Sequence, residues 1–101
     1  MTSKLLDAAL SLAPQRSLDV STLRRDQHLR STLVNMVPDP EAHADNDQRF
    51  YKGLSLGFDL ALRTLRAEAS PSPHIVHHIH VFEYAKCMAD AGQLLTGGTL
   101  A

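Results

Sequence analysis

The pattern of apolar and polar positions predicts a chain made of helices. Ser3 to Ala13 repeats apolar residues at helical spacing and meets Pro14, which stops a helix. Asp19 is a suitable N-cap for a second helix over Val20 to Val37, and the sequence Pro38-Asp39-Pro40 ends it. We therefore expect two amphipathic helices in the first forty residues.

The strongest helical pattern covers Asp47 to Ala69. Its polar side chains fall in one narrow stripe and apolar residues occupy most of the remaining circumference, which is more than a surface helix needs. We predict that this helix is buried at the centre of the fold or lies at a subunit interface. Gly53, Gly57 and Ala61 follow at a spacing of four and would let another helix approach closely, either within the chain or across a homodimer seam.

A last helix is predicted from Ser72-Pro73 to Ala91, with Gly92 just after its end. The β-branched and aromatic residues at His77–Phe82 would also suit a short strand. The caps at both ends favour the helix, so we predict an all-α bundle of about four helices. An α+β fold with a strand at His77–Phe82 is the alternative.

Length and composition fit one small globular protein. The 101 residues are predicted to form a single helical domain over 1–101, with a frayed tail at 97–101. Ten basic and eleven acidic residues leave a net charge of -1, which gives no overall attraction to nucleic acid or to an anionic membrane. The charges within the longest apolar helix argue against a membrane span. The single Cys87 cannot form a disulfide within the chain, and the first residues do not show the cationic segment followed by an apolar segment that is typical of a secretion signal. We therefore predict a cytoplasmic protein.

Four of the six histidines lie between His74 and His80. His74 and His78 would share a helix face at the spacing that lets two imidazoles meet one zinc ion. No third candidate ligand stands at the spacing that a known zinc motif requires. We therefore predict no bound metal and no other cofactor. A histidine-based metal protein is the third function that we consider.

The sequence gives little support for an enzyme. Cys87 lies in the middle of a predicted helix beside Met88, with no basic helix terminus that would lower the pKa of its thiol. Serines lack a nucleophile-elbow context, and no glycine loop of the phosphate-binding kind is present. We therefore predict a protein without catalytic residues.

Arginines gather in the first third of the chain and suggest a binding surface. Arg24, Arg25 and Arg30 lie on the outer face of the second predicted helix, and Arg16 lies just upstream. Such a basic face would dock on an acidic surface of another protein. We therefore predict a small adaptor, regulator or inhibitor that acts by occupying a partner's surface. The run from Ser17 to Arg30 also resembles a helix-turn-helix reader, and a DNA-binding regulator is the alternative.

Overall fold

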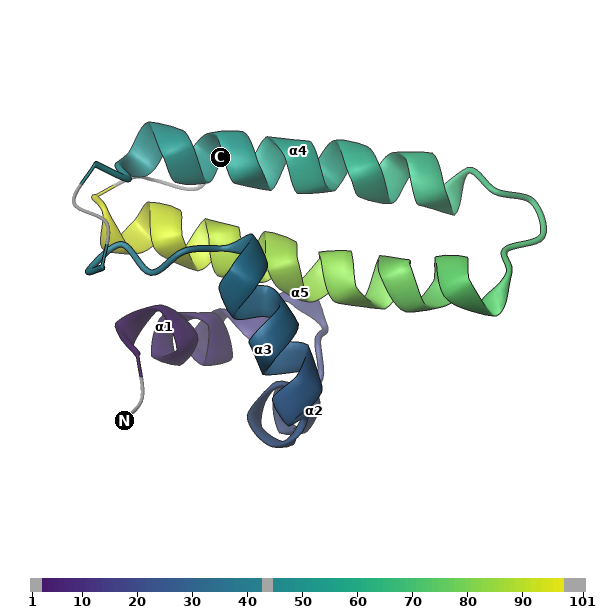
Figure 1. The fold of residues 1–101 in the computed structure, drawn as a ribbon, viewed down its shortest axis with the longest axis horizontal. Coiled ribbons are helices and arrows are strands. Elements are labelled where there is room, and N and C mark those ends of the chain that lie inside the picture. The colour runs from purple at the N-terminus through teal and green to yellow at the C-terminus, as the bar shows by residue number, and fades with distance from the viewer. Residues whose placement is uncertain (1–2, 43–44, 98–101) are drawn as a thin grey trace.

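The computed structural model describes residues 3–42 and 45–97. Helix α1 spans Lys4–Leu12 and continues into a short 3₁₀ helix, η1, over Ala13–Arg16. Helices α2 (Val20–Arg25) and α3 (Gln27–Met36) follow, and a loop leads to the long helices α4 (Gln48–Arg66) and α5 (Pro73–Leu95). α4 and α5 form an antiparallel hairpin, and α1 to α3 pack against one half of it (Figure 1).

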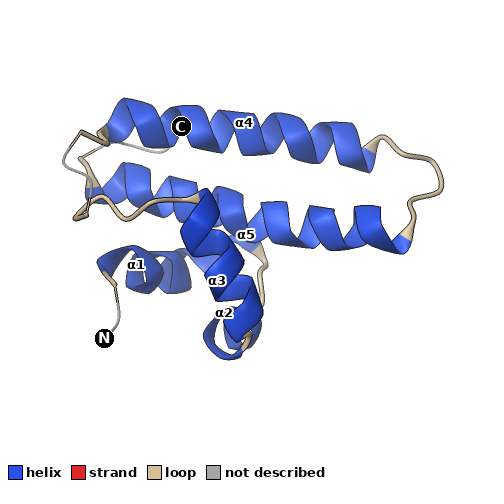
Figure 2. Ribbon diagram, in the orientation of Figure 1, coloured by secondary structure: helices blue, strands red, loops and turns tan. Residues whose placement is uncertain are grey.

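The all-α prediction is confirmed for the described residues. His77–Phe82 is helical throughout, in the first half of α5, and Figure 2 shows no strand in the part of the chain that the structure describes. Ser72 caps α5 by accepting a hydrogen bond from the Ile75 backbone N–H, and Pro73 occupies the first helical position. These start signals outweigh the β-branched residues that follow.

α5 is the central helix, and the expectation that the Asp47–Ala69 helix is buried at the centre of the chain is wrong. α5 contacts α1, α3 and α4, whereas α4 packs mainly on α5. Leu56 and Leu60 of α4 are 61% and 66% exposed. The buried residues of α4 are Tyr51, Ser55 and Leu62, and those of α5 are Val81, Tyr84, Ala85, Cys87, Met88, Ala89, Asp90, Ala91 and Gly92.

The second predicted helix is two helices. Asp26 separates α2 from α3, because its backbone (φ -80°, ψ 93°) leaves the helical region. Its carboxylate accepts a hydrogen bond from the Leu29 N–H at 2.9 Å and thereby caps α3. Leu23 and Leu29, one on each side of the break, are both buried. The bend therefore produces two short helices that each bury a leucine: α3 packs on α5, and α2 packs on α1 and α3.

Gly92, rather than Gly53 or Gly57, provides the close contact between the two long helices. A Cβ atom at Gly92 would lie 2.3 Å from Cδ1 of Tyr51, whereas one at Gly53 or Gly57 would meet no atom of residues 3–42 and 45–97 within 4 Å. Gly92 therefore belongs to the interior of α5, which continues to Leu95, and it does not end the helix as predicted. Close packing of Gly53 and Gly57 within the chain is also wrong, and their role in a dimer seam stays a prediction.

The two tyrosines hold the connecting segments to the hairpin. The Tyr84 hydroxyl donates to the Asp19 carbonyl at 3.0 Å, and the Tyr51 hydroxyl donates to the Pro38 carbonyl. Burial raises the pKa of both phenols, and the carboxylate of Asp39 raises that of Tyr51 further. Of the predicted tail 97–101, only Gly97 lies among the described residues.

Candidate functional site

A buried carboxylate joins three parts of the fold. Asp90 of α5 is 3% exposed and accepts hydrogen bonds from Ser55 of α4 and from Lys86, one turn away, at 3.3 Å. Arg16 of η1 lies 3.0 Å from the same carboxylate. The predicted binding residue Arg16 is therefore paired inside its own chain. A buried carboxylate without such partners would be very costly, so this network ties η1, α4 and α5 together.

Cys87 lies beside this network and is buried. Its thiol is 3.6 Å from the Ala9 carbonyl. Burial is the main cause that raises the pKa of Cys87 from 9.0 to about 11, against a smaller opposing effect of Arg16. The thiol is thus protonated at neutral pH and packed between α5 and α1, which is unlike the environment of a reactive cysteine.

Of the other three predicted binding arginines, Arg30 forms hydrogen bonds within the chain, and Arg24 and Arg25 are exposed. Arg30 donates hydrogen bonds from Nη1 to the carbonyls of Leu23 and Arg24, at the C-terminal end of α2. Its guanidinium thus satisfies carbonyls that the helix end leaves open. Arg24 and Arg25 occupy the last turn of α2 and are exposed. Asp19 and Asp26 nearby cap α2 and α3 with their carboxylates.

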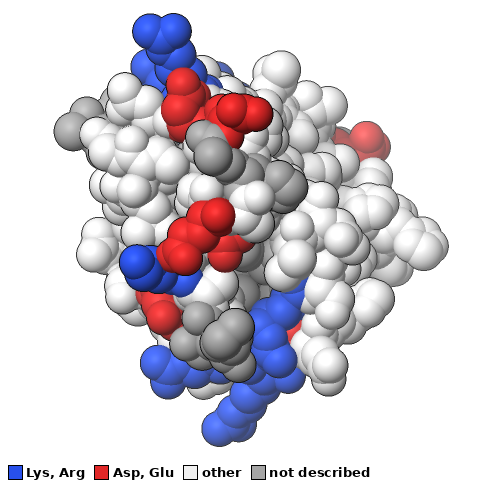
Figure 3. Space-filling model, turned by 60° about the vertical axis from the view of Figure 1, so that its left-hand side comes forward, with Lys and Arg blue, Asp and Glu red and all other residues white. Residues whose placement is uncertain are grey.

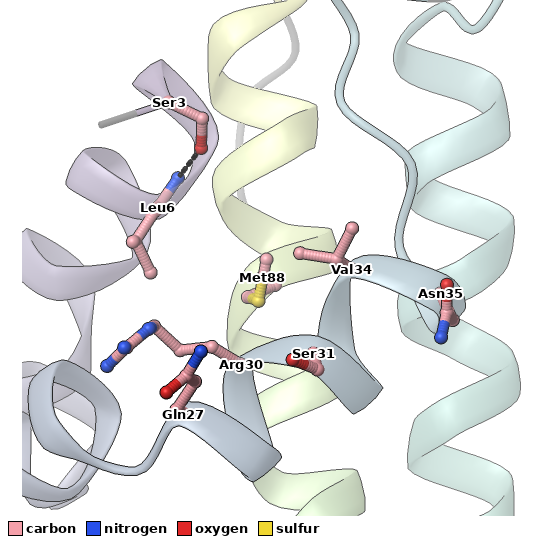
Figure 4. A pocket seen from close by; sticks show the side chains of 8 residues that line it. All are labelled: Ser3, Leu6, Gln27, Arg30, Ser31, Val34, Asn35 and Met88. Carbon is pink, nitrogen blue, oxygen red and sulfur yellow. Dashed lines mark hydrogen bonds between the residues drawn. The ribbon is translucent and has the colours of Figure 1, made fainter. Parts of the chain in front are cut away.

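An open groove has Arg30 at its edge. It lies between α1 and α3 over α5 and has a volume of about 570 Å³. Figure 4 shows Leu6, Val34 and Met88 around it, one from each of the three helices, with Gln27 and Arg30 at the start of α3. Val34 is 65% exposed, and of the described residues that line the groove, Arg30 alone is charged. Ser3, Ser31 and Asn35 add uncharged polar groups to the lining. A groove with an apolar part and a basic edge suits an acidic segment that carries an apolar side chain.

Sequence reasoning did not find the apolar part of this groove. Leu6, Val34 and Met88 belong to three segments far apart in the sequence, and each looks like an ordinary core position in its own helix. A helical pattern gives the direction of an apolar face but not which faces meet. The arginines were found because they cluster along the sequence itself.

The outer face of α4 is a second apolar surface. Gly53, Leu56, Gly57 and Leu60 are exposed on the side that faces away from α5, and Ala61 is half-buried at its edge. Gly53, Gly57 and Ala61 are the predicted seam, and in the described part of the chain no atom lies within 4 Å of a Cβ built at Gly53 or Gly57.

The histidines lie at the end of the hairpin that α1 to α3 leave uncovered. His74, His77, His78 and His80 are all exposed, and the His80 ring packs edge-on against Tyr84 with centroids 5.0 Å apart. Among residues 3–42 and 45–97, no three histidine, cysteine or acidic side chains come together in a group that could hold a metal ion.

Acidic side chains gather at the opposite end. Figure 3 shows them as a band across the end where the loop between α3 and α4 lies, with basic groups above and below. The loop carries Asp39, Glu41, Asp45 and Asp47. Asp47 caps α4, and Asp39 accepts a hydrogen bond from the Glu41 N–H, so two of these carboxylates stabilise local backbone.

Comparison with known proteins adds no relationship. Neither the protein-family models, nor the curated proteins, nor the solved structures contain a match to this chain. None of the helices in the described part of the chain is both long enough and apolar enough to span a membrane.

Proposed function

We propose that this protein is a small non-enzymatic regulator that binds an acidic surface of a partner protein. The observation that carries the proposal is the groove between α1 and α3 with Arg30 at its edge. Arg30 also donates to carbonyls in the last turn of α2, which carries the exposed pair Arg24 and Arg25. The groove offers an apolar anchor point, and the arginines favour carboxylates around it. Arg30 contributes by its charge at the groove edge while it holds the end of α2 in place.

Two features support binding over chemistry. The cysteine and the buried carboxylate that could serve catalysis are packed and paired, as the raised pKa of Cys87 and the partners of Asp90 indicate. The exposed groups with strong binding potential are arginines and large apolar side chains. Surfaces of this kind act by contact with another macromolecule.

The geometry favours a protein partner over DNA. α2 has six residues and carries Arg24 and Arg25 in its last turn. A recognition helix of the helix-turn-helix class contacts base edges with residues near its N-terminus. The arginines here would therefore lie at the far end of a very short helix.

The test compares three variants for capture of proteins from the lysate of the natural host. Arg24→Glu/Arg25→Glu reverses the basic pair, Val34→Asp places a charge on the groove, and Arg49→Glu/Lys52→Glu makes the same charge change on exposed α4 residues. We expect the wild type and the α4 variant to capture an acidic protein that the first two variants fail to capture. Binding of the purified partner to the groove variants should then be reduced at least roughly tenfold.

Circular dichroism controls for folding, which these exposed positions should leave unchanged. Equal capture by all variants would overturn the proposal. Recovery that nuclease abolishes, with affinity falling steeply as salt rises, would replace it with the DNA-binding alternative.

A further inference from the structure

Two of the clustered histidines lie one turn apart at the start of α5. His74 and His78 are four residues apart in the helix Pro73–Leu95, and both are exposed. Residues at this spacing lie on the same side of a helix, with Cβ atoms about 5 to 6 Å apart. An extended chain would hold them about 13 Å apart. The helix therefore brings both imidazoles within reach of a single ion.

Both imidazoles are available to a ligand. Within residues 3–42 and 45–97, neither side chain takes part in a hydrogen bond or an ion pair. The His78 ring has the ring of His77 as a neighbour, with centroids 6.1 Å apart. His80 differs, because its ring packs edge-on against Tyr84. Binding at His74 and His78 therefore breaks no polar contact within the described part of the chain.

A pair of imidazoles suits a divalent transition-metal ion. Imidazole nitrogen binds zinc, nickel and copper, whereas magnesium and calcium prefer oxygen ligands. The missing third ligand, from which the sequence predicts no bound metal, lowers the affinity of such a pair. Water would fill the remaining coordination positions, and the ion would exchange with solvent instead of staying as a resident cofactor. The first turn of α5 contains no acidic residue, so the imidazoles alone would select the ion.

The position of the pair determines what a bound ion would stabilise. Between His74 and His80 no residue is buried, and α4 alone lies beside this half of α5 (Figure 1). An ion held by both imidazoles would link the first two turns of the helix. It would lose one ligand when these turns open. Preferential binding to the helical form therefore stabilises the uncovered end of the hairpin.

We propose that His74 and His78 form a site for an exchangeable divalent transition-metal ion, which holds the first turns of α5 closed. The groove with Arg30 is lined by α1, α3 and Met88 in the second half of α5. The two sites share no residue, so the metal site and the proposed partner surface stand or fall separately.

Hydrogen exchange with and without Zn²⁺ tests the site near neutral pH. An ion that binds only the closed form makes opening about elevenfold rarer when free Zn²⁺ is ten times its dissociation constant. Amides from Ile75 to His80 should therefore exchange about tenfold more slowly in Zn²⁺ than in EDTA. Mg²⁺ should not slow them, because it prefers oxygen ligands. Exchange that Zn²⁺ leaves unchanged, or that Mg²⁺ slows equally, would overturn the proposal.

Single substitutions identify the ligands. His74→Ala and His78→Ala should each abolish the effect of Zn²⁺, whereas the matched controls His77→Ala and His80→Ala should retain it. All four side chains are exposed, and circular dichroism without metal checks that each variant folds. A Zn²⁺ effect that survives in His74→Ala or His78→Ala, or disappears in a control, would show that other groups hold the ion.

Sedimentation velocity at the same Zn²⁺ concentration shows whether one chain is sufficient. We expect a monomer with Zn²⁺ and with EDTA, and calorimetry should give one ion per chain. A dimer that forms only with Zn²⁺ would mean that histidines of two copies share the ion. That result would overturn a site built within one helix.

Discussion

At the scale of single residues, the contact between the two long helices requires glycine at one position, Gly92. Tyr51 is fully buried, its ring faces Gly92 and its hydroxyl is held by the Pro38 carbonyl. The ring is therefore fixed from two sides and cannot move away from a new neighbour. Gly53 lies on the same hairpin, but in the described part of the chain no atom is within 4 Å of a Cβ built there, so the two glycines contribute differently to stability.

Gly92→Ala and Gly53→Ala should therefore change stability in opposite directions. The Cβ at position 92 would come within 2.3 to 2.8 Å of three Tyr51 ring atoms, and such overpacking costs about 1 to 3 kcal/mol. Alanine at position 53 removes a helix penalty of about 1 kcal/mol without a clash. Urea unfolding measures both free energies. A stabilised Gly92→Ala variant would show that the contact with Tyr51 is absent in solution.

Cys87 should make stability depend on pH in the alkaline range. Its pKa is about 11 in the folded protein against 9.0 ordinarily, so folding favours the protonated thiol. The resulting stabilisation is complete below pH 9 and is lost as pH rises from 9 to 11. At roughly 1.4 kcal/mol per pKa unit, the loss is about 3 kcal/mol.

Comparison with Cys87→Ala isolates this effect, because Tyr51 and Tyr84 also have raised pKa values and contribute in both proteins. The free energy of unfolding of wild type should fall more steeply than that of the variant between pH 9 and 11. Parallel pH profiles would contradict a buried thiol.

At the scale of elements, sequence patterns predicted the helices better than their places. Asp47 caps α4 and Ser72 with Pro73 starts α5 as the sequence indicated, because caps act on the backbone within a few residues. Local capping residues do not indicate which helix lies at the centre of the fold. α5 carries histidines, Lys86 and Asp90, which made it look less apolar than α4.

The structure explains why those polar residues did not keep α5 at the surface. Its histidines lie in the half that extends beyond α1 to α3, and Asp90 is buried because Arg16 and Ser55 come to it from other elements. Such partners are brought by folding and leave no mark at a fixed spacing. The arginine cluster could be predicted because its members are close together in the sequence. The ion pair of Arg16 with Asp90 and the groove formed by Leu6, Val34 and Met88 could not, because folding brings those residues together.

At the scale of the whole molecule, the two ends of the hairpin differ in how well they are covered. Between His74 and His80, no residue is buried, whereas nearly every residue from Tyr84 to Gly92 is. Figure 1 shows the first half of α5 extending with α4 alone beside it. Helices that bury little surface open locally at a lower free energy than the global unfolding.

Hydrogen exchange should therefore divide α5 in two. We expect amides from Ile75 to His80 to exchange through local opening with little dependence on denaturant, and those from Tyr84 to Gly92 to exchange only through global unfolding. The reason is that opening the uncovered end exposes few apolar groups, whereas opening the other end would break the Asp90 network and expose the core against α1.

Mass-spectrometric exchange on dilute protein measures this, with urea below the unfolding transition. Equal protection along the whole of α5 would instead mean that the hairpin unfolds as one unit with the rest of the fold, contrary to its uneven burial.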